Sequence, residues 1–288
     1  MPRVATIDFH VTSECSQECP YCWGPQEVAG VDTATARAIV EHITAAGARR
    51  IVFTGGDPLQ REDLGELIRH ARDFGLEVAV STTGDRLTAA FLAEHGAEID
   101  LISLPLDGAS EEVSARTKKE GHFAAVLAAL DLLAAYPGID IKVATPVTRH
   151  NLADVPGIVG LLDGRAAVQP NRLFYNVFQA FPRSMDPGVH WDDLVVSAAE
   201  FAALRLTVEA GPHAVHINWL SHETLDRLYV MVFPDGTLTI PVGTSFRSYG
   251  PFLAVEDLDA LLAHAEFDAA KHLCHAAGWG RGGPALPT

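Results

Sequence analysis

From the start of the chain to Phe178, two spacing patterns of apolar residues alternate. Short β-branched runs, such as residues 4–11, have the composition of buried strands, and longer runs with helical spacing of apolar residues, such as residues 32–46, separate them. Glycines such as Gly47 and Gly75 mark where the helices stop. The predicted strands span 4–11, 50–54, 77–81, 100–104, 140–145 and 172–178, and the helices between them span 32–46, 62–73, 87–95, 123–135 and 155–162.

This alternation predicts an α/β fold with a parallel sheet. Parallel neighbours need crossover connections, and crossovers are right-handed in nearly all proteins, so six such units curl into an open or closed barrel. Functional residues are then expected just after the carboxyl ends of the strands.

The pattern changes after about residue 184. The expected elements there are a helix over 193–205, a mixed polar stretch over 213–222, a hairpin over 228–240 that turns at Pro234-Asp235-Gly236, and a final helix over 257–272. We therefore divide the chain into a barrel over residues 1–183 and an α+β extension over residues 184–288.

Charge and hydropathy narrow the possible partners. The formal net charge is −16, which would repel nucleic-acid phosphates and anionic membrane surfaces. No apolar run approaches the roughly 20 residues that cross a bilayer, and the first residues show no signal-peptide pattern. We expect a cytoplasmic protein that has no nucleic-acid or membrane partner.

Three of the four cysteines lie in one loop, Cys15-Ser-Gln-Glu-Cys19-Pro-Tyr-Cys22, directly after the first predicted strand. The loop is too tight for a disulfide framework, so reduced thiols are expected. Three thiolates can hold three irons of a four-iron cluster and leave the fourth iron open to a substrate or cofactor. The alternative is a structural zinc site that a histidine completes, in a binding module without chemistry of its own.

The spacing Cys-x3-Cys-x2-Cys, with Tyr21 before the last cysteine, resembles the signature loop of the radical S-adenosylmethionine (radical SAM) superfamily. The resemblance implies a partial (β/α)6 barrel in which Cys15, Cys19 and Cys22 bind one [4Fe–4S] cluster. It also implies that the open iron chelates S-adenosylmethionine (SAM). With an electron from a flavodoxin-like or ferredoxin-like donor, such enzymes cleave SAM to methionine and a 5′-deoxyadenosyl radical, which takes a hydrogen atom from a substrate.

Motifs at the ends of the next strands strengthen this resemblance. Thr54-Gly-Gly-Asp57-Pro58 is similar to the family's Gly-Gly-Glu-Pro motif, with aspartate in place of the usual glutamate. Ser81-Thr-Thr-Gly84 and Ser103-Leu-Pro-Leu-Asp107 are similar to its Thr-Asn-Gly and Ser-x-Asp-Gly motifs. The residues that the resemblance assigns to SAM are Tyr21, Gly55, Gly56, Asp57, Pro58, Thr82, Thr83, Ser103, Asp107, Arg116, Thr145 and Gln179.

Several of these residues also have a structural interpretation. Gly-Gly-Asp-Pro by itself is more often a plain turn between a strand and a helix. Arg116 opens a stretch in which Arg or Lys can meet the SAM carboxylate, but Lys118 and Lys119 fit a solvated face equally well. Phe178, next to Gln179, offers a shelf for adenine, although core packing is its default role.

The C-terminal part, from Leu228 to Leu258, resembles the SPASM or shortened twitch extension that holds auxiliary iron–sulfur clusters in some radical SAM enzymes. Val242 stands about where a cluster cysteine is expected, and Cys274 is the fourth and last cysteine. We therefore predict no auxiliary cluster. Cys274 is either a small buried residue or a catalytic thiol that gives a hydrogen atom to a substrate radical, as in radical SAM epimerases.

The extension is expected to cover the substrate. A polar cluster of His213, His216, Asn218 and His222 is predicted to line the substrate pocket, although an isolated histidine is more often a surface or core residue. We predict epimerisation or oxidation of a small polar substrate such as a sugar, an aminoglycoside or another natural-product intermediate, and the acidic composition suits an amine-bearing one. The alternatives are a peptide-modifying (RiPP-type) enzyme and a viperin-like nucleotide-processing enzyme.

Overall fold

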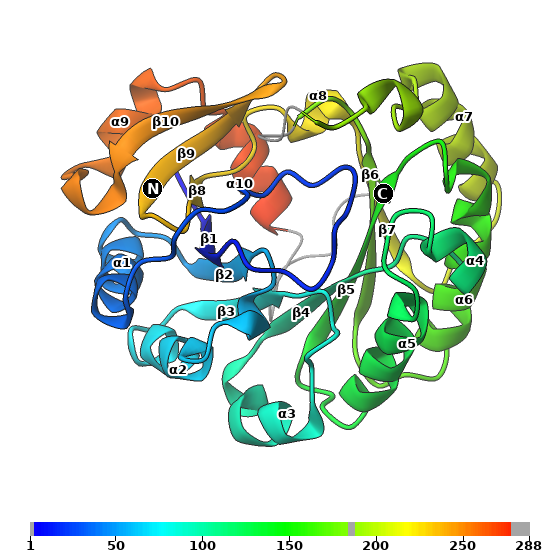
Figure 1. Cartoon of the computed structure of the whole chain (residues 1–288), viewed down its shortest axis with the longest axis horizontal. Coiled ribbons are helices and arrows are strands. Elements are labelled where there is room, and N and C mark those ends of the chain that lie inside the picture. The colour runs from blue at the N-terminus through cyan, green and yellow to red at the C-terminus, as the bar shows by residue number, and fades with distance from the viewer. Residues whose placement is uncertain (1–2, 184–187, 278–288) are drawn as a thin grey trace.

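A computed structural model describes residues 3–183 and 188–277. The strands are β1 (Thr6–Thr12), β2 (Arg50–Gly55), β3 (Glu77–Ser81), β4 (Leu101–Pro105), β5 (Asp140–Val147), β6 (Leu173–Gln179), β7 (His216–Leu220), β8 (Met231–Val232), β9 (Thr237–Val242) and β10 (Ser245–Pro251). They form one sheet in the order β10-β9-β8-β1-β2-β3-β4-β5-β6-β7. The sheet curls around a central space, and the loop after β1 crosses that space (Figure 1).

Most helices lie outside the curled sheet, whereas α10 lies inside its curve (Figure 1). The helices are α1 (Thr33–Ala45), α2 (Leu64–Asp73), α3 (Ala89–His95), α4 (Glu111–Ser114), α5 (His122–Leu133), α6 (Val155–Ala166), α7 (Ala198–Val208), α8 (His222–Leu225), α9 (Leu258–His264) and α10 (Ala269–Ala277). Polar side chains cap several of them: Asp32 accepts the Thr35 N–H at the start of α1, and Ser197 and Glu200 form a capping box at the start of α7.

The predicted parallel barrel is confirmed. Strands β1 to β7 pair with their sequence neighbours in parallel, and β8 also runs parallel to β1. Only the β8–β9 and β9–β10 pairs are antiparallel among the described strands. The architecture is thus a six-unit α/β barrel sheet with an α+β extension.

The C-terminal elements differ in detail from their predictions. A seventh parallel strand, β7, lies within the stretch predicted only as mixed and polar. The predicted last helix is two helices, because the backbone is extended at Ala265 after α9. Strand β7 pairs with β6 and β8 pairs with β1, so residues on the C-terminal side extend both edges of the sheet. The predicted boundary at residue 184 lies outside the described residues.

The side chains of β1 point alternately into the hydrophobic core and into the barrel interior. Ile7, Phe9 and Val11 are fully buried in the large hydrophobic core that includes residues of α1. Thr6, Asp8 and His10 instead line a cavity inside the barrel, because successive side chains of a strand point to opposite faces. Among the described helices, none combines the length and the apolar character that a bilayer crossing requires.

Candidate functional site

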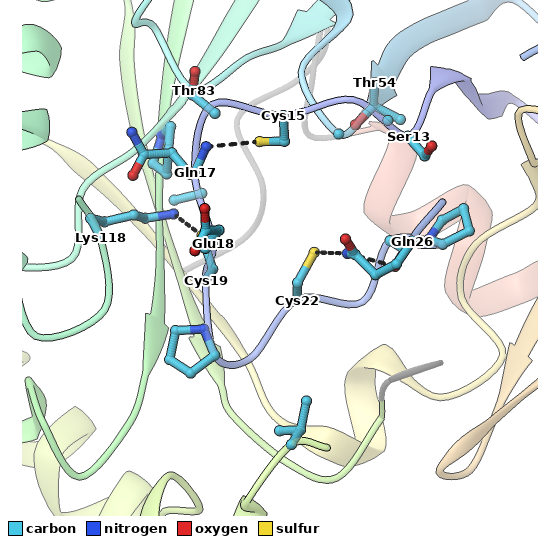
Figure 2. Close-up of a pocket in the computed structure, with 18 of the residues that line it drawn as sticks. Ser13, Cys15, Gln17, Glu18, Cys19, Cys22, Gln26, Thr54, Thr83 and Lys118 are labelled. Carbon is cyan, nitrogen blue, oxygen red and sulfur yellow. Dashed lines mark hydrogen bonds between the residues drawn. The ribbon is translucent and has the colours of Figure 1, made fainter. Parts of the chain in front are cut away.

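A cavity of about 640 Å³ opens where strands β1 to β5 end. The cysteine loop forms one side of it, and Thr54, Ser81 and Ser103 from β2, β3 and β4 form part of the other. Figure 2 shows Cys15 and Cys22 on two arms of the loop around this space. The predicted meeting of the loop with the neighbouring strand ends is therefore confirmed.

Each of the three thiols has a hydrogen-bond donor beside it (Figure 2). The pairs are the Gln17 backbone N–H with Cys15 Sγ at 3.4 Å, Lys118 Nζ with Cys19 Sγ at 2.9 Å, and Gln26 Nε2 with Cys22 Sγ at 3.5 Å. Burial raises the pKa of the Cys15 thiol to about 11 and also raises the pKa of Cys22. A bound metal must therefore displace thiol protons, and the donors then stabilise the sulfur anions.

The end of β2 fixes the cysteine loop through very close backbone contact. The Gly56 N–H donates to the Thr12 carbonyl at 2.8 Å, and the Asp57 N–H donates to the Glu14 carbonyl at 2.7 Å. A Cβ atom on Gly56 would lie 2.2 Å from the Glu14 carbonyl oxygen, so only glycine fits there. Gly55 and Gly56 also line the cavity, as predicted for residues that let a ligand approach the main chain.

The carboxylate of Asp57 is buried beneath the cavity wall. It accepts hydrogen bonds from Thr82 Oγ1 at 2.6 Å and from Thr83 Oγ1 at 2.8 Å, and neither Asp57 nor the buried Pro58 is part of the lining. Neither side chain therefore borders the cavity, and contact between this motif and SAM stays a prediction for its backbone. Asp57 instead orients two threonines that do line the cavity, as predicted for Thr82 and Thr83.

A buried polar network lies behind Cys19. Asp107 is fully buried and accepts hydrogen bonds from the Tyr21 hydroxyl and from Thr117 Oγ1, and Lys118 Nζ lies 3.9 Å from its carboxylate. Burial lowers the pKa of the Lys118 ammonium group, but the attraction of Asp107 and Cys19 is larger than this effect, so the pKa is raised overall. The solvated-face interpretation of Lys118 is wrong, and Asp107 acts on the cavity through its neighbours because it is not in the lining itself.

Two other predicted SAM residues are misplaced. Arg116 is exposed and donates to Glu112 and to the His150 carbonyl. Thr145 is fully buried, donates to the Leu106 carbonyl and accepts from the Tyr175 hydroxyl at 2.9 Å. Neither residue lines a described cavity, because the first lies on the outer surface and the second is a satisfied core hydroxyl.

A second cavity, which we call the inner cavity, has a volume of about 370 Å³ and continues from the first into the barrel. Both linings include Cys19, Cys22 and Lys118, so the two spaces meet at the cysteine loop. Tyr21 and Gln179 line the inner cavity. Gln179 is positioned by the Val196 carbonyl and by the backbone N–H of His222, so its expected place beside adenine stays a prediction.

The inner cavity has ionisable lining residues that motif comparison missed: Asp8, His10, Arg50 and Lys142. The available signal was the strict alternation in β1, in which polar residues at Thr6, Asp8 and His10 interrupt a run that otherwise reads as apolar.

The four residues predicted to form the substrate cluster do not come together there. His213 bonds to Asp163 and to the Val208 carbonyl, and His216 is exposed at the amino end of β7. Asn218 donates to Asn176, and the His222 ring stacks on Phe181. The linings of the two described cavities include none of these four residues. For His213 and His216 the reason is the direction of β7, because a parallel β7 places its amino end away from the carboxyl edge.

Cys274 is exposed on α10, which corrects both of its predicted roles. The helix presents His272, His275 and Ala276 to the inner cavity, whereas Cys274 is absent from the described linings. His272 anchors the helix, since its Nε2 accepts the Ala5 N–H at 3.0 Å and its Nδ1 contacts the Leu228 carbonyl.

Arg183 joins the cysteine loop to the C-terminal part of the chain. Its side chain is fully buried, and its guanidinium carbon lies 4.5 Å from the ring centroids of Trp23 and Phe181. The same group donates to the Gly243 carbonyl at 3.0 and 2.7 Å. Burial lowers the pKa of this guanidinium to about 10, so it remains charged at neutral pH.

The arrangement fits an iron–sulfur cluster with a further ligand. Three thiols of one short loop border a cavity of about 640 Å³, and each thiol has a donor that stabilises the anion. Thr82, Thr83 and Ser103 line the opposite wall. Three thiolates leave one iron of a four-iron cluster without a cysteine, which suits a site that binds a small ligand.

Comparison with known proteins supports this interpretation. A family model described as the radical SAM superfamily matches residues 9–162, just over half of the chain. An S-adenosylmethionine-dependent nucleotide dehydratase of Lacinutrix mariniflava is 26% identical over 273 residues, which cover 90% of this chain and 55% of that protein. A PqqA peptide cyclase of Xanthomonas oryzae pv. oryzae is 31% identical over 174 residues, 56% of this chain and 44% of that protein. The chain spans about half the length of the curated relatives it matches.

Solved structures share the fold. Native anSMEcpe with bound AdoMet matches with a TM-score of 0.69 at 14% identity, over 93% of this chain and 81% of that one. SuiB of Streptococcus suis bound to its precursor peptide SuiA matches with a TM-score of 0.67 at 11% identity, over 94% of this chain and 66% of that one. Identities this low establish a common fold and leave the reaction to be argued from the site.

Proposed function

The chain belongs to the radical SAM superfamily, whose members use a [4Fe–4S] cluster and SAM, and we propose that it is an enzyme that abstracts a hydrogen atom from a small polar substrate. The observation that carries the proposal is the placement of three thiols, each beside a donor, at the mouth of a cavity that continues into the barrel. Cys15, Cys19 and Cys22 would hold the cluster.

When bound, the cluster and SAM supply an electron and a 5′-deoxyadenosyl radical. The chain's own residues bind and orient SAM and the substrate and shield them from water. The main chain at Gly55 and Gly56, together with Thr82 and Thr83, whose hydroxyls Asp57 holds in place, forms part of the wall available to SAM. Trp191 and Tyr229 are among the residues after position 188 that line the inner cavity. Their position supports the proposal that the C-terminal extension covers the substrate and excludes water.

For the outcome of the reaction we propose epimerisation or two-electron oxidation. A cavity of about 370 Å³ suits a small molecule, or one residue of a larger one. Peptide modification is the second candidate, because a PqqA peptide cyclase is among the relatives and SuiB has been solved with a precursor peptide. We further propose a flavodoxin-like or ferredoxin-like electron donor.

The test is anaerobic incubation of reconstituted protein with SAM, a reductant and a metabolite extract. We expect 5′-deoxyadenosine to form faster when the extract is present, with one extract component consumed. A parallel incubation with short peptides decides between the two candidates. The proposal of radical chemistry fails if no 5′-deoxyadenosine forms under any of these conditions while the cluster is intact.

Cys274→Ala is expected to keep full turnover and the same product. The thiol is exposed on α10 and is outside the described linings, so it is not positioned to quench a radical inside the barrel. Product stereochemistry and rate, measured beside the wild type, check this. A changed product or a loss of more than about tenfold in rate would restore the hydrogen-donor hypothesis.

Lys118→Met is expected to lower the midpoint potential of the cluster by on the order of 50 mV, close to a tenfold change for a one-electron couple. The ammonium donates to Cys19 Sγ at 2.9 Å, and such a donor favours the more negative, reduced state. Redox titration followed by electron paramagnetic resonance measures the potential. The neighbouring Lys119→Met, which removes an exposed partner of Glu18, is the control and should leave the potential nearly unchanged.

A further inference from the structure

One arginine contacts both ends of the cysteine loop. Arg61 lies between the short turn Pro58–Gln60 and α2. Its Nη1 atom donates to the Val11 carbonyl at 3.0 Å and to the Val31 carbonyl at 2.9 Å. Val11 lies in β1, just before the loop, and Val31 lies just before α1. Because both carbonyls bond to the same nitrogen, the two ends of the loop lie next to each other, and all three cysteines lie between them.

Arg61 is itself held in a fixed orientation. Its Nε and Nη2 donate to the two carboxylate oxygens of Asp63, the second of them at 2.9 Å. Asp63 also accepts from Thr33 Oγ1, in the first residue of α1, at 2.6 Å. Two parallel bonds to one carboxylate fix the plane of a guanidinium group. The side chains of Arg61 and Asp63 are 11% and 21% exposed, so water has little access to the pair.

The guanidinium divides its donors between these partners. Nε and Nη2 bond to Asp63, and Nη1 carries two N–H groups that match the two carbonyls. Burial raises the pKa of Asp63, but hydrogen bonds from Arg61 and Thr33 outweigh this effect and lower it overall, so the acid is ionised at neutral pH. Only a planar guanidinium can bond to the carboxylate and to both carbonyls at once.

Two further observations show that the loop depends on links between its ends. A Cβ atom on Gly30 would lie 3.2 Å from the Val11 carbonyl oxygen, so the end of the loop packs tightly against its beginning. Ser13 Oγ donates to the Val28 carbonyl at 2.8 Å and forms a second link of the same kind. Within the described segment 13–30, a single backbone–backbone hydrogen bond, from the Cys22 N–H to the Cys19 carbonyl, joins two of its own residues. The loop therefore has almost no regular structure that could order it from within.

Order in the loop bears on metal binding. Fixing the backbone of a disordered segment costs conformational entropy. If metal binding has to order the loop, this cost lowers the affinity of the thiols for the metal, whereas a loop that is already ordered avoids it. The contacts of Arg61 involve protein atoms alone, so they hold the ends of the loop without any help from a metal.

We propose that Arg61 is a positioning residue that closes the cysteine loop in the metal-free protein, through the Val11 and Val31 carbonyls, and thereby raises the affinity of the three thiols for metal. The proposal rests on the proposed function in taking Cys15, Cys19 and Cys22 as the ligands of the cluster. Asp63 acts one step further away, because it orients the guanidinium and does not contact the loop ends through its own side chain.

Arg61→Met tests the proposal in reduced, metal-free protein under anaerobic conditions. Cobalt(II) alone is the probe, since its thiolate absorption reports binding by cysteine, and we expect its affinity to fall about tenfold. Hydrogen–deuterium exchange with mass spectrometry measures order in the loop directly. Residues 13–31 should exchange faster in Arg61→Met than in the wild type, whereas residues 155–166 of α6 should exchange at the same rate.

Arg72→Met is the matched control. Arg72 Nη1 also donates to a carbonyl and a carboxylate, those of Leu76 and Asp100, but at the amino end of β3, away from the cysteine loop. This variant should change neither cobalt affinity nor exchange of residues 13–31. If Arg61→Met does not fold, Asp63→Asn replaces it, and we expect about threefold weaker cobalt binding because the guanidinium loses its fixed plane.

Cobalt affinity within about twofold of the wild type, or loop exchange no faster than in the wild type, would overturn the proposal. A different result would count against the proposed function alone. If wild-type thiols bind no cobalt while exchange of the loop still depends on Arg61, the cysteines are not a metal site, and the positioning role of Arg61 stands.

Discussion

Cys19→Ala is expected to purify with less than one iron per chain and to form no 5′-deoxyadenosine, whereas the wild type carries about four irons. Cys19 Sγ accepts a hydrogen bond from the Lys118 ammonium. Cys15 and Cys22 cannot replace it as a ligand, because each would hold a different iron. Iron and sulfide analysis, with the visible absorption of the cluster, measures the first effect. Chromatographic detection of 5′-deoxyadenosine measures the second.

The matched control is Cys274→Ala, the same chemical change at an exposed position on α10. It should retain the full iron content. The thermal unfolding of Cys19→Ala without metal should stay close to that of the metal-free wild type, which separates loss of a ligand from loss of fold. A Cys19→Ala protein with four irons would show that some other side chain completes the site.

Gly56→Ala is expected to displace the cysteine loop, to weaken SAM binding by at least about tenfold and to lower the free energy of unfolding by about 2–4 kcal/mol. A Cβ atom at this position would lie 2.2 Å from the Glu14 carbonyl oxygen and 2.5 Å from that of Ser13. Both are backbone atoms of the loop, so no side-chain rotation can relieve the overlap. Calorimetric titration with SAM and chemical denaturation measure the two effects.

Gly160→Ala is the control for the backbone effect of the substitution. Gly160 lies inside α6, and a Cβ there would meet no heavy atom within 4 Å beyond its chain neighbours and its own helix backbone. Helix propensity predicts a gain of about 0.5–1 kcal/mol in the free energy of unfolding and unchanged SAM affinity. If Gly56→Ala behaved like this control, the close contact between β2 and the cysteine loop would not be what positions the thiols.

The barrel could be predicted from the sequence because the spacing of apolar residues within each segment identifies that segment as a strand or a helix. In β1, Ile7 and Phe9 alternate with polar residues, and in α1 apolar residues recur at helical spacing, so the period alone identifies each element. The cysteine loop could be placed for the same reason, since it directly follows a strand whose end is recognisable. Parallel pairing then brought Thr54 and Ser103 to the same cavity as the thiols.

Side-chain orientation around the cavities could not be predicted in the same way. Lys118 and Lys119 are adjacent and chemically identical, and only the packing behind Cys19 makes one buried and leaves the other exposed. His213 and His216 are close in sequence to residues of the barrel, but the direction of β7 places them at its amino end. The role of Asp57 depends on its contacts with Thr82 and Thr83, which follow the end of β3.

The most direct test of the whole account is metal analysis and electron paramagnetic resonance of anaerobically purified protein, with and without SAM. We predict about four irons per chain and, after reduction, a cluster signal that changes when SAM is added, because an iron without a cysteine is available to bind it. A protein that holds zinc, or an iron centre whose signal is indifferent to SAM, would contradict the account.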